Sequence, residues 1–431
     1  MRSTEWLPAS RLVLGFVPHP ARVAPRAAIG DRGRWSTRKE RNTEMSDFTF
    51  TCPECNQDLT VDEKDQGIRA ACPNCGKEID IPSADEPSRD LTDVGEIAAR
   101  VTARISSAAG VERLEGFSFR EMFSEVFKKH TEDEVERYFA VGGPDTTPSI
   151  LEVDTTWPKP WVFFRTFVIA FLVYFSLISA WYAHNNIFLV PGIILVGSFA
   201  LPFATLLFFM EANVRRNVSL YQINKLVFRG GAIGLSFSLF FFAVMGVINL
   251  PFIPSLAAIA EEPGKLLALY LIINNKKYPY ILNGLLFGAA VGAGFAAFES
   301  AGYALYFGLN DEVGGAMESV IMTRGILSPF AHIAWTAMCG GALWRVKGKQ
   351  PFNFSMLRDP RFLKVFIAAI VLHALWNLPI HKLPFYSSYF ILGAVAWVII
   401  LGLVQEGLKE LRAEKKTALE NQTTEAASTH E

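Results

Sequence analysis

The chain has 431 residues, of which 41 are Lys or Arg and 42 are Asp or Glu, so its formal net charge is −1. Residues 161–404 hold 24 charged side chains in 244 positions, about 10%, whereas the other 187 positions are about 32% charged. A segment of 244 residues with so few charged side chains excludes a single water-soluble globule, because its apolar runs could not be hidden from water. The near-zero net charge excludes nucleic-acid binding through bulk positive charge. The composition therefore indicates a membrane domain, residues 161–406, with polar flanking segments.

Residues 1–44 show no hydrophobic period and carry eight Arg and one Lys against four acidic residues. The apolar run at residues 12–17 is too short for the core of a signal peptide. We expect this stretch to be disordered, and the preferred interpretation is that translation starts at Met45. An Arg-rich targeting sequence is the alternative.

Residues 45–82 contain two CxxC pairs separated by sixteen residues, Cys52 with Cys55 and Cys72 with Cys75. Each pair presents two thiolates to one centre, and the alternating runs LTVD and EIDIP favour short strands. This spacing predicts a small β-rich zinc ribbon with a structural Zn²⁺ and no chemistry of its own. Two disulfides are the alternative. Because the segment is acidic, we expect it to dock a cytosolic protein and not a nucleic acid.

Residues 83–160 have the composition of a linker that contains one amphipathic helix. In the run FREMFSEVFKKH, five apolar side chains recur at helical spacing: Phe119, Met122, Phe123, Val126 and Phe127. This stripe would lie on the membrane surface or pack against the ribbon.

Eight apolar segments are each long enough to cross a hydrocarbon core of ~30 Å. They are approximately residues 161–183, 187–210, 226–249, 251–273, 280–308, 317–344, 362–380 and 385–406. Sixteen basic residues lie in alternate connections and in the tail, residues 407–431, against one, Lys382, on the opposite side. The positive-inside rule then predicts a multi-pass protein of the cell membrane with both termini in the cytoplasm. The expected fold class is an all-α polytopic membrane protein with about eight transmembrane helices and a small N-terminal β-rich zinc ribbon.

Ionisable side chains within the spans cost roughly 2.5–3.5 kcal/mol each on insertion scales, so each needs a reason. The candidates, with one amide, are Glu261, Glu262, Lys265, Glu299, His332, His373 and Asn377. At ~1.5 Å per residue, the carboxylates and imidazoles of four spans fall at roughly one depth. Lys265 follows Glu261 by four residues and Glu262 by three, so it can neutralise one of the two. Glu211 lies at the end of a span, where we expect it to be solvated.

Four short motifs contain these residues: EEPGK at 261–265, FESAGY at 298–303, HIAW at 332–335 and HALWN at 373–377. In this order they resemble the EExxK, FExxxY and histidine motifs of the PrsW family of intramembrane proteases, which is related to the CAAX prenyl protease group. The resemblance covers about residues 187–406. It implies a carboxylate that activates water with histidine, an Asn or His at the oxyanion, and a membrane-protein substrate such as the anti-sigma factors. In the CAAX group an Arg and a His stand where this chain has Lys265 and Glu299.

The predicted function is therefore that of an intramembrane peptidase that cleaves membrane proteins. Peptide hydrolysis needs a base for water, a group that faces the oxyanion and an acid for the leaving amine. We assign Glu261 as the base, with Glu262 as the second choice, and expect Lys265 to hold the other carboxylate. His332 would share or orient the water. The oxyanion would be faced by His373 and Asn377.

Three alternatives are left open by the sequence. A zinc-dependent protease could use Glu299, His332 and His373, with an open position for water. A transporter could use the same carboxylates as relay groups. A catalytically silent membrane receptor could recruit cytosolic partners through the ribbon. An intramembrane aspartyl pair is excluded, because Asp311 and Asp359 lie in predicted loops.

Overall fold

The computed structural model describes most of the chain, with gaps. The described residues are 28–30, 34–36, 47–52, 54–55, 57–62, 68–81, 89–131, 134, 137, 139–143, 145–247, 254–273, 277–310, 315–378 and 387–428. The chain forms two compact units, Met1–Ile97 and Ala98–Glu431.

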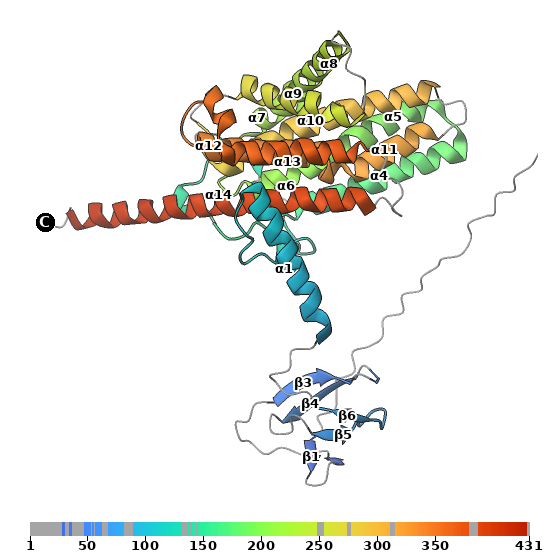
Figure 1. The fold of residues 1–431 in the computed structure, drawn as a ribbon, viewed down its shortest axis with the longest axis vertical. Helices are drawn as coiled ribbons and strands as arrows, with labels where there is room; N and C mark the ends of the chain where they lie inside the picture. Colours follow the sequence, from blue (N-terminus) through green and yellow to red (C-terminus); the bar gives the residue numbers. More distant parts are fainter. Residues whose placement is uncertain are drawn as a thin grey trace, which may run out of the picture. The chain divides into compact units, whose positions relative to one another are not determined.

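In the part that the structure describes, the first unit contains three antiparallel hairpins (Figure 1). Their strands are β1 (Ala28–Gly30) with β2 (Arg34–Ser36), β3 (Asp47–Thr51) with β4 (Asp58–Asp62), and β5 (Arg69–Ala71) with β6 (Glu78–Asp80). Alternate side chains point inward, so Leu59, Val61, Ala70 and Ile79 are buried. The predicted β-rich region is confirmed. Apart from β1 and β2, the stretch 1–44 lies outside the described residues.

The segment predicted to be a linker contains two helices. Helix α1 (Arg89–Ala109), which the sequence analysis did not predict, begins in the first unit and ends in the second. Helix α2 is limited to Phe119–Met122, where the Ser118 hydroxyl accepts a hydrogen bond from an amide of its first turn. Met122 is buried, but Phe127 is 90% exposed, because the residues after α2 form turns. The predicted amphipathic stripe is therefore not one continuous helix.

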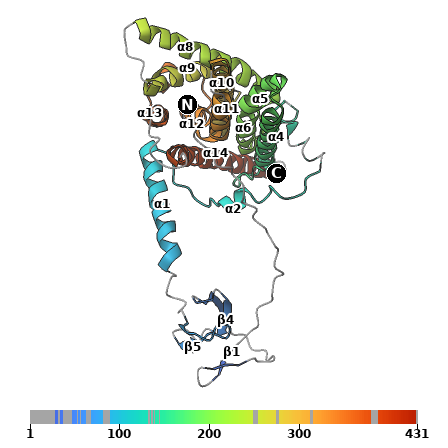
Figure 2. The ribbon, with the colours of Figure 1, turned by 90° about the vertical axis from the view of Figure 1, so that its right-hand side faces the viewer.

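The second unit is built of helices (Figures 1 and 2). In chain order they are η2 (Ile150–Glu152), α4 (Val162–His184), η3 (Ile187–Leu189), α5 (Val190–Leu195), η4 (Val196–Ala200), α6 (Leu201–Ala212), α7 (Leu220–Lys225), η5 (Leu226–Gly230), α8 (Gly231–Val247), η6 (Pro254–Leu256), α9 (Ala257–Ile272), α10 (Ile281–Asn310), α11 (Ala316–Ile326), η7 (Ser328–Phe330), α12 (His332–Lys347), η8 (Phe354–Arg358), α13 (Pro360–Trp376) and α14 (Ser387–Ser428). Helix α14 projects beyond the other helices of its unit (Figure 1). Most of the predicted tail is thus a continuation of this helix.

Each of the eight predicted spans coincides with helical structure, but fewer helices are long and apolar enough to cross a membrane. Among the described residues there are five such helices, or six if α11 and the helix after it, bent by 49°, count as one span. Helix α9 has 16 residues and α13 has 17. At ~1.5 Å per residue, each is only about 24–26 Å long. Both therefore fall short of the ~30 Å hydrocarbon core.

Helix α10 lies at the centre of the second unit and is buried from Ile281 to Ala297. Its Gly284, Gly288 and Gly292 face α12, as expected for a stripe of small residues between two membrane helices. A Cβ atom on Gly292 would lie 2.6 Å from the main-chain oxygen of His332, so only glycine fits there. This close approach holds the first turn of α12 beside the part of α10 that lies about two turns before Glu299.

The prediction that Glu211 is solvated is wrong. Its side chain is buried and accepts hydrogen bonds from three main-chain amides at the start of α4, those of Trp161, Val162 and Phe163, at 2.9, 3.0 and 2.8 Å. The first amides of a helix have no partner within the helix, and a carboxylate also interacts favourably with the helix dipole. Glu211, at the end of α6, therefore caps α4.

Candidate active site

Five helices bring a cluster of ionisable side chains together in the membrane unit. The side chains of this cluster are Glu261, Glu262 and Lys265 of α9, Glu299 of α10, Arg324 of α11, His332 of α12 and His373 of α13. The break between α11 and α12 places the first imidazole, because Pro329 has no amide hydrogen with which α11 could continue. The chain leaves helical geometry at Ala331 and helix α12 begins at His332. That residue therefore stands at the bend and faces α9 and α10.

Glu262 is held from two sides. The Lys265 ammonium donates to its Oε1 at 2.6 Å, and Nδ1 of His373 lies 2.8 Å from the same oxygen. All three residues are buried. Because Glu262 is paired with the Lys265 ammonium, its side chain is an ionised carboxylate, which can only accept hydrogen bonds. His373 must then carry its proton on Nδ1. In the neutral ring, the lone pair of Nε2 faces away from Glu262.

His332 is oriented in the same manner by a second carboxylate. Lys265 Nζ lies 3.0 Å from Nδ1 of His332, and an ammonium has no acceptor, so this nitrogen carries the lone pair. The proton is then on Nε2, which is 2.9 Å from Oε2 of Glu299. Arg324 forms an ion pair with the same Glu299 oxygen. Glu299 thus fixes His332 as Glu262 fixes His373.

Glu261 stands between the two imidazoles. Its Oε2 atom is 3.8 Å from Nδ1 of His332 and 3.7 Å from Nε2 of His373, the two nitrogens that carry lone pairs. The Lys265 ammonium is 3.9 Å away. This oxygen is buried and forms no hydrogen bond with any residue that the structure describes. A buried carboxylate oxygen without a partner is costly, so the position indicates a missing ligand.

The donor set around this oxygen fits a metal ion. Glu261, His332 and His373 each offer one ligand atom, and these atoms lie within 4.8 Å of one another. Two imidazoles and a carboxylate form a common catalytic zinc set, and imidazoles in such sites usually donate their other N–H to a carboxylate. Both imidazoles here do so. The zinc alternative of the sequence analysis used Glu299, whereas the structure gives Glu261 this place.

Aromatic side chains enclose the cluster. Trp335 stacks on His373 with 4.3 Å between ring centres and an angle of 19° between the planes. The Lys265 ammonium lies 4.5 Å from the ring centre of Phe295, which favours the cation. Both rings are fully buried. They reduce water access to the charges and strengthen the electrostatic interactions among them.

A chamber of about 280 Å³ reaches the cluster at His332. Its lining also includes Ser300, Arg324, Ser328 and Asn377. Asn377 ends α13, where its main-chain N–H donates to the His373 carbonyl at 3.2 Å. The sequence analysis missed both serines, because Ser300 occupies a variable position of the motif FESAGY and Ser328 lies in no motif. The Ser328 hydroxyl is buried without a hydrogen-bond partner in the described part of the chain.

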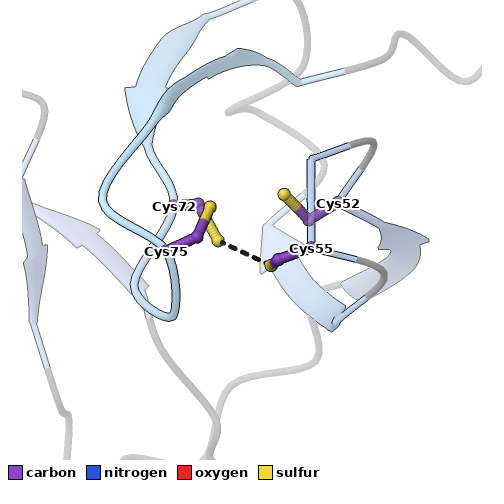
Figure 3. A group of neighbouring side chains, drawn as sticks. All are labelled: Cys52, Cys55, Cys72 and Cys75. Atoms are coloured by element: carbon purple, nitrogen blue, oxygen red, sulfur yellow. Dashed lines mark hydrogen bonds between the residues drawn. The ribbon is translucent and has the colours of Figure 1, made fainter.

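The four cysteines of the first unit form a separate cluster (Figure 3). All are free thiols with Sγ atoms within 4.8 Å of one another, and the distance between the Cys55 and Cys72 sulfurs is 3.8 Å. Tetrahedral zinc with Zn–S bonds of ~2.3 Å places its sulfurs about 3.8 Å apart. A hydrogen bond from Asn74 lowers the pKa of Cys55 to about 7, which favours the metal-binding thiolate. The cluster therefore fits a structural zinc ion better than disulfides.

The helical fold and the cluster around Glu261 define a class of protein. It is a multi-pass membrane protein whose buried carboxylates and imidazoles meet at a polar chamber, as in a hydrolase. Residues 230–420 match the sequence model of the PrsW-protease family, described as PrsW family intramembrane metalloprotease. This segment contains every residue of the cluster around Glu261 and none of the four cysteines of the ribbon. The match supports a membrane-embedded protease and not a transporter or a silent receptor. Comparisons with curated proteins and with solved structures found no match.

Proposed function

We propose that this protein hydrolyses peptide bonds of membrane proteins at the centre formed by Glu261, His332 and His373. The observation that carries the proposal is the unpartnered Glu261 oxygen, which faces the lone pairs of both imidazoles at 3.7–3.8 Å. A water molecule between these groups would meet a carboxylate that accepts its proton. The peptide would enter from the chamber, which His332 joins to the cluster.

The same three side chains would hold a divalent metal ion, in line with the metalloprotease description of the matching family. A bound ion would polarise the carbonyl and make water a better nucleophile. Glu262 and Glu299 keep the two imidazoles in the required tautomers, while Lys265 and Arg324 neutralise these carboxylates. The tautomers are thereby set before the ion or the substrate arrives.

A mechanism without a metal ion is favoured by one contact. The Lys265 ammonium lies 3.0 Å from Nδ1 of His332, the nitrogen that a metal would need. In this version Glu261 is the general base and His332 orients the water. Asn377 and the Ser328 hydroxyl, both in the lining of the chamber, would donate to the oxyanion.

The proposal also covers the substrate class and the orientation of the protein in the membrane. Membrane-protein substrates follow from the place of the site among apolar helices, and regulators of the anti-sigma type remain a prediction from the motif resemblance. Sixteen basic residues on one side support cytoplasmic termini. With that orientation the zinc ribbon lies in the cytosol, where it would dock a protein partner.

The proposal is tested with cells that carry the wild type or the Glu261→Gln variant. New N-termini in the membrane proteome are compared between the two, and we expect a set of cleavages to be absent from the variant. Glu420→Gln, a change at an exposed residue of α14, is the matched control and should preserve all cleavages. Full cleavage by Glu261→Gln protein would refute the assignment.

Metal content separates the two versions of the mechanism. The full chain is purified with all four ribbon cysteines changed to Ser, so that bound metal reports the membrane centre alone. We expect about one ion per chain, lost on His373→Ala substitution. Protein that cleaves its substrate without bound metal would select the metal-free version.

A further inference from the structure

An apolar groove of about 650 Å³ lies between α4 and α11, in the membrane unit. Its apolar lining includes Tyr174, Ile178, Met322, Ile326, Leu327 and Phe390. Phe175, at its rim on α4, is 54% exposed. Because α4 is apolar and its most apolar stretch is only 11% buried, this rim faces hydrocarbon in a membrane.

The groove adjoins the catalytic chamber. Thr323 and Leu327 line both cavities, and the chamber reaches the cluster at His332. A chain segment lying in the groove therefore borders the space in which hydrolysis is proposed.

One acidic side chain lines the groove. Glu318, in the first turn of α11, is only 8% exposed. Its main-chain oxygen accepts a hydrogen bond from the Tyr174 hydroxyl at 3.1 Å, but its carboxylate has no hydrogen bond or ion pair within the described residues. A carboxylate buried beside apolar side chains in a membrane is costly unless it is paired. No described residue pairs with this carboxylate, so a segment bound in the groove would supply the partner.

We propose that this groove binds the transmembrane segment of the substrate and that Glu318 pairs with a Lys or Arg side chain of that segment. The inference rests on the proposed proteolytic function and names the substrate class. Thr323, where the chamber begins, follows Glu318 by five residues, about 7.5 Å along the helix. The basic residue would therefore lie at least one to two helical turns from the bond that is cleaved. An apolar segment without a basic residue would leave the carboxylate unpaired.

The test uses synthetic Leu/Ala transmembrane peptides, each with a single Lys at one of a series of positions or with norleucine there. Binding to the full chain in lipid nanodiscs is measured in the Glu261→Gln background, so that hydrolysis does not interfere. We expect Lys at one depth to bind at least about tenfold more tightly than norleucine, the range of a buried charge-assisted hydrogen bond. Glu318→Gln should remove this preference, and Glu318→Lys should transfer it to peptides with Glu.

An unchanged Lys preference in the Glu318→Gln protein would overturn the assignment of this carboxylate. A second variant tests the groove itself, because Met322→Trp should fill it and weaken the binding of every peptide. Ile169→Trp, on the exposed face of α4, is the matched control. Equal peptide binding by both tryptophan variants would refute docking in the groove, even if Glu318→Gln failed to fold.

Failure of the proposed function gives a different result. If the protein were not a protease, the wild type would release no peptide fragments, whatever the peptides' affinities. If only the docking inference were wrong, the wild type would cleave Lys and norleucine peptides equally well. Mass spectrometry of the reaction products distinguishes these two outcomes.

Discussion

The four-cysteine cluster and the Glu261 centre both gather metal-binding groups, but they are built by opposite means. The cysteines come from the single segment 52–75 and two tight turns, around a small apolar core that includes Leu59 and Ile79. The Glu261 centre joins side chains of α9, α12 and α13 that packing and ion pairs already hold in place. A metal ion should therefore be needed for the fold of the first cluster and only for the chemistry of the second.

The largest expected effect tests this difference directly. Replacing Cys52 and Cys72 with Ser should unfold the ribbon, because a structural zinc site contributes roughly 10–16 kcal/mol at neutral pH. Amide hydrogen exchange should then show loss of protection in β3–β6 and unchanged protection in α10. Cys339→Ser removes a buried thiol of the membrane unit and should leave the ribbon protected. A ribbon that stays protected without its cysteines would contradict the comparison.

The membrane centre should depend on its internal ion pairs. Lys265→Met leaves the buried Glu262 carboxylate without its cation, which typically costs about 3–5 kcal/mol. We expect the midpoint of unfolding to shift to a lower concentration of sodium dodecyl sulfate. Lys416→Met, at an exposed position, is the control. Equal midpoints for these two variants would mean that the ion pair does not stabilise the site.

The carboxylates behind the imidazoles should affect function more than folding. Glu299→Gln keeps the shape of the side chain but weakens the orientation of His332, and such changes typically lower metal affinity or activity about 10–100-fold. Glu406→Gln is the control, because it weakens an ion pair with Arg345 away from the centre. Cleavage of a membrane substrate by the two variants is compared at equal amounts of folded protein. A similar loss in both would assign Glu299 a purely structural role.

The two clusters also differ in how much the sequence could predict. The CxxC spacing is local, so it indicated the ligands, the strands and a zinc ion without any tertiary information. For the membrane centre, helical rise gave a common depth for the charged groups. Depth does not determine rotation about the helix axis. The sequence therefore could not choose between Glu261 and Glu299 as the carboxylate that both imidazoles share.

Other errors have the same origin in tertiary contacts. The partners of Glu211 are amides about fifty residues earlier in the chain, and no local pattern indicates a cap supplied by another helix. The two serines of the chamber, Ser300 and Ser328, were missed because an isolated Ser has no diagnostic spacing. The lengths of α9 and α13 were overestimated because the adjoining residues are also apolar in sequence. Local patterns predicted elements and depths, whereas contacts between helices had to be observed.

The smallest expected effect concerns the cap of α4, the helix that forms one wall of the proposed docking groove. Glu211→Ala leaves three amides without their acceptor, and loss of a helix cap typically costs about 0.5–2 kcal/mol. Glu211→Gln keeps an acceptor oxygen and should lose less stability in the same detergent titration. Because the cap lies far along α4 from Tyr174, the variant should retain cleavage of a bound substrate. Loss of cleavage without loss of stability would mean that the start of α4 also positions the groove.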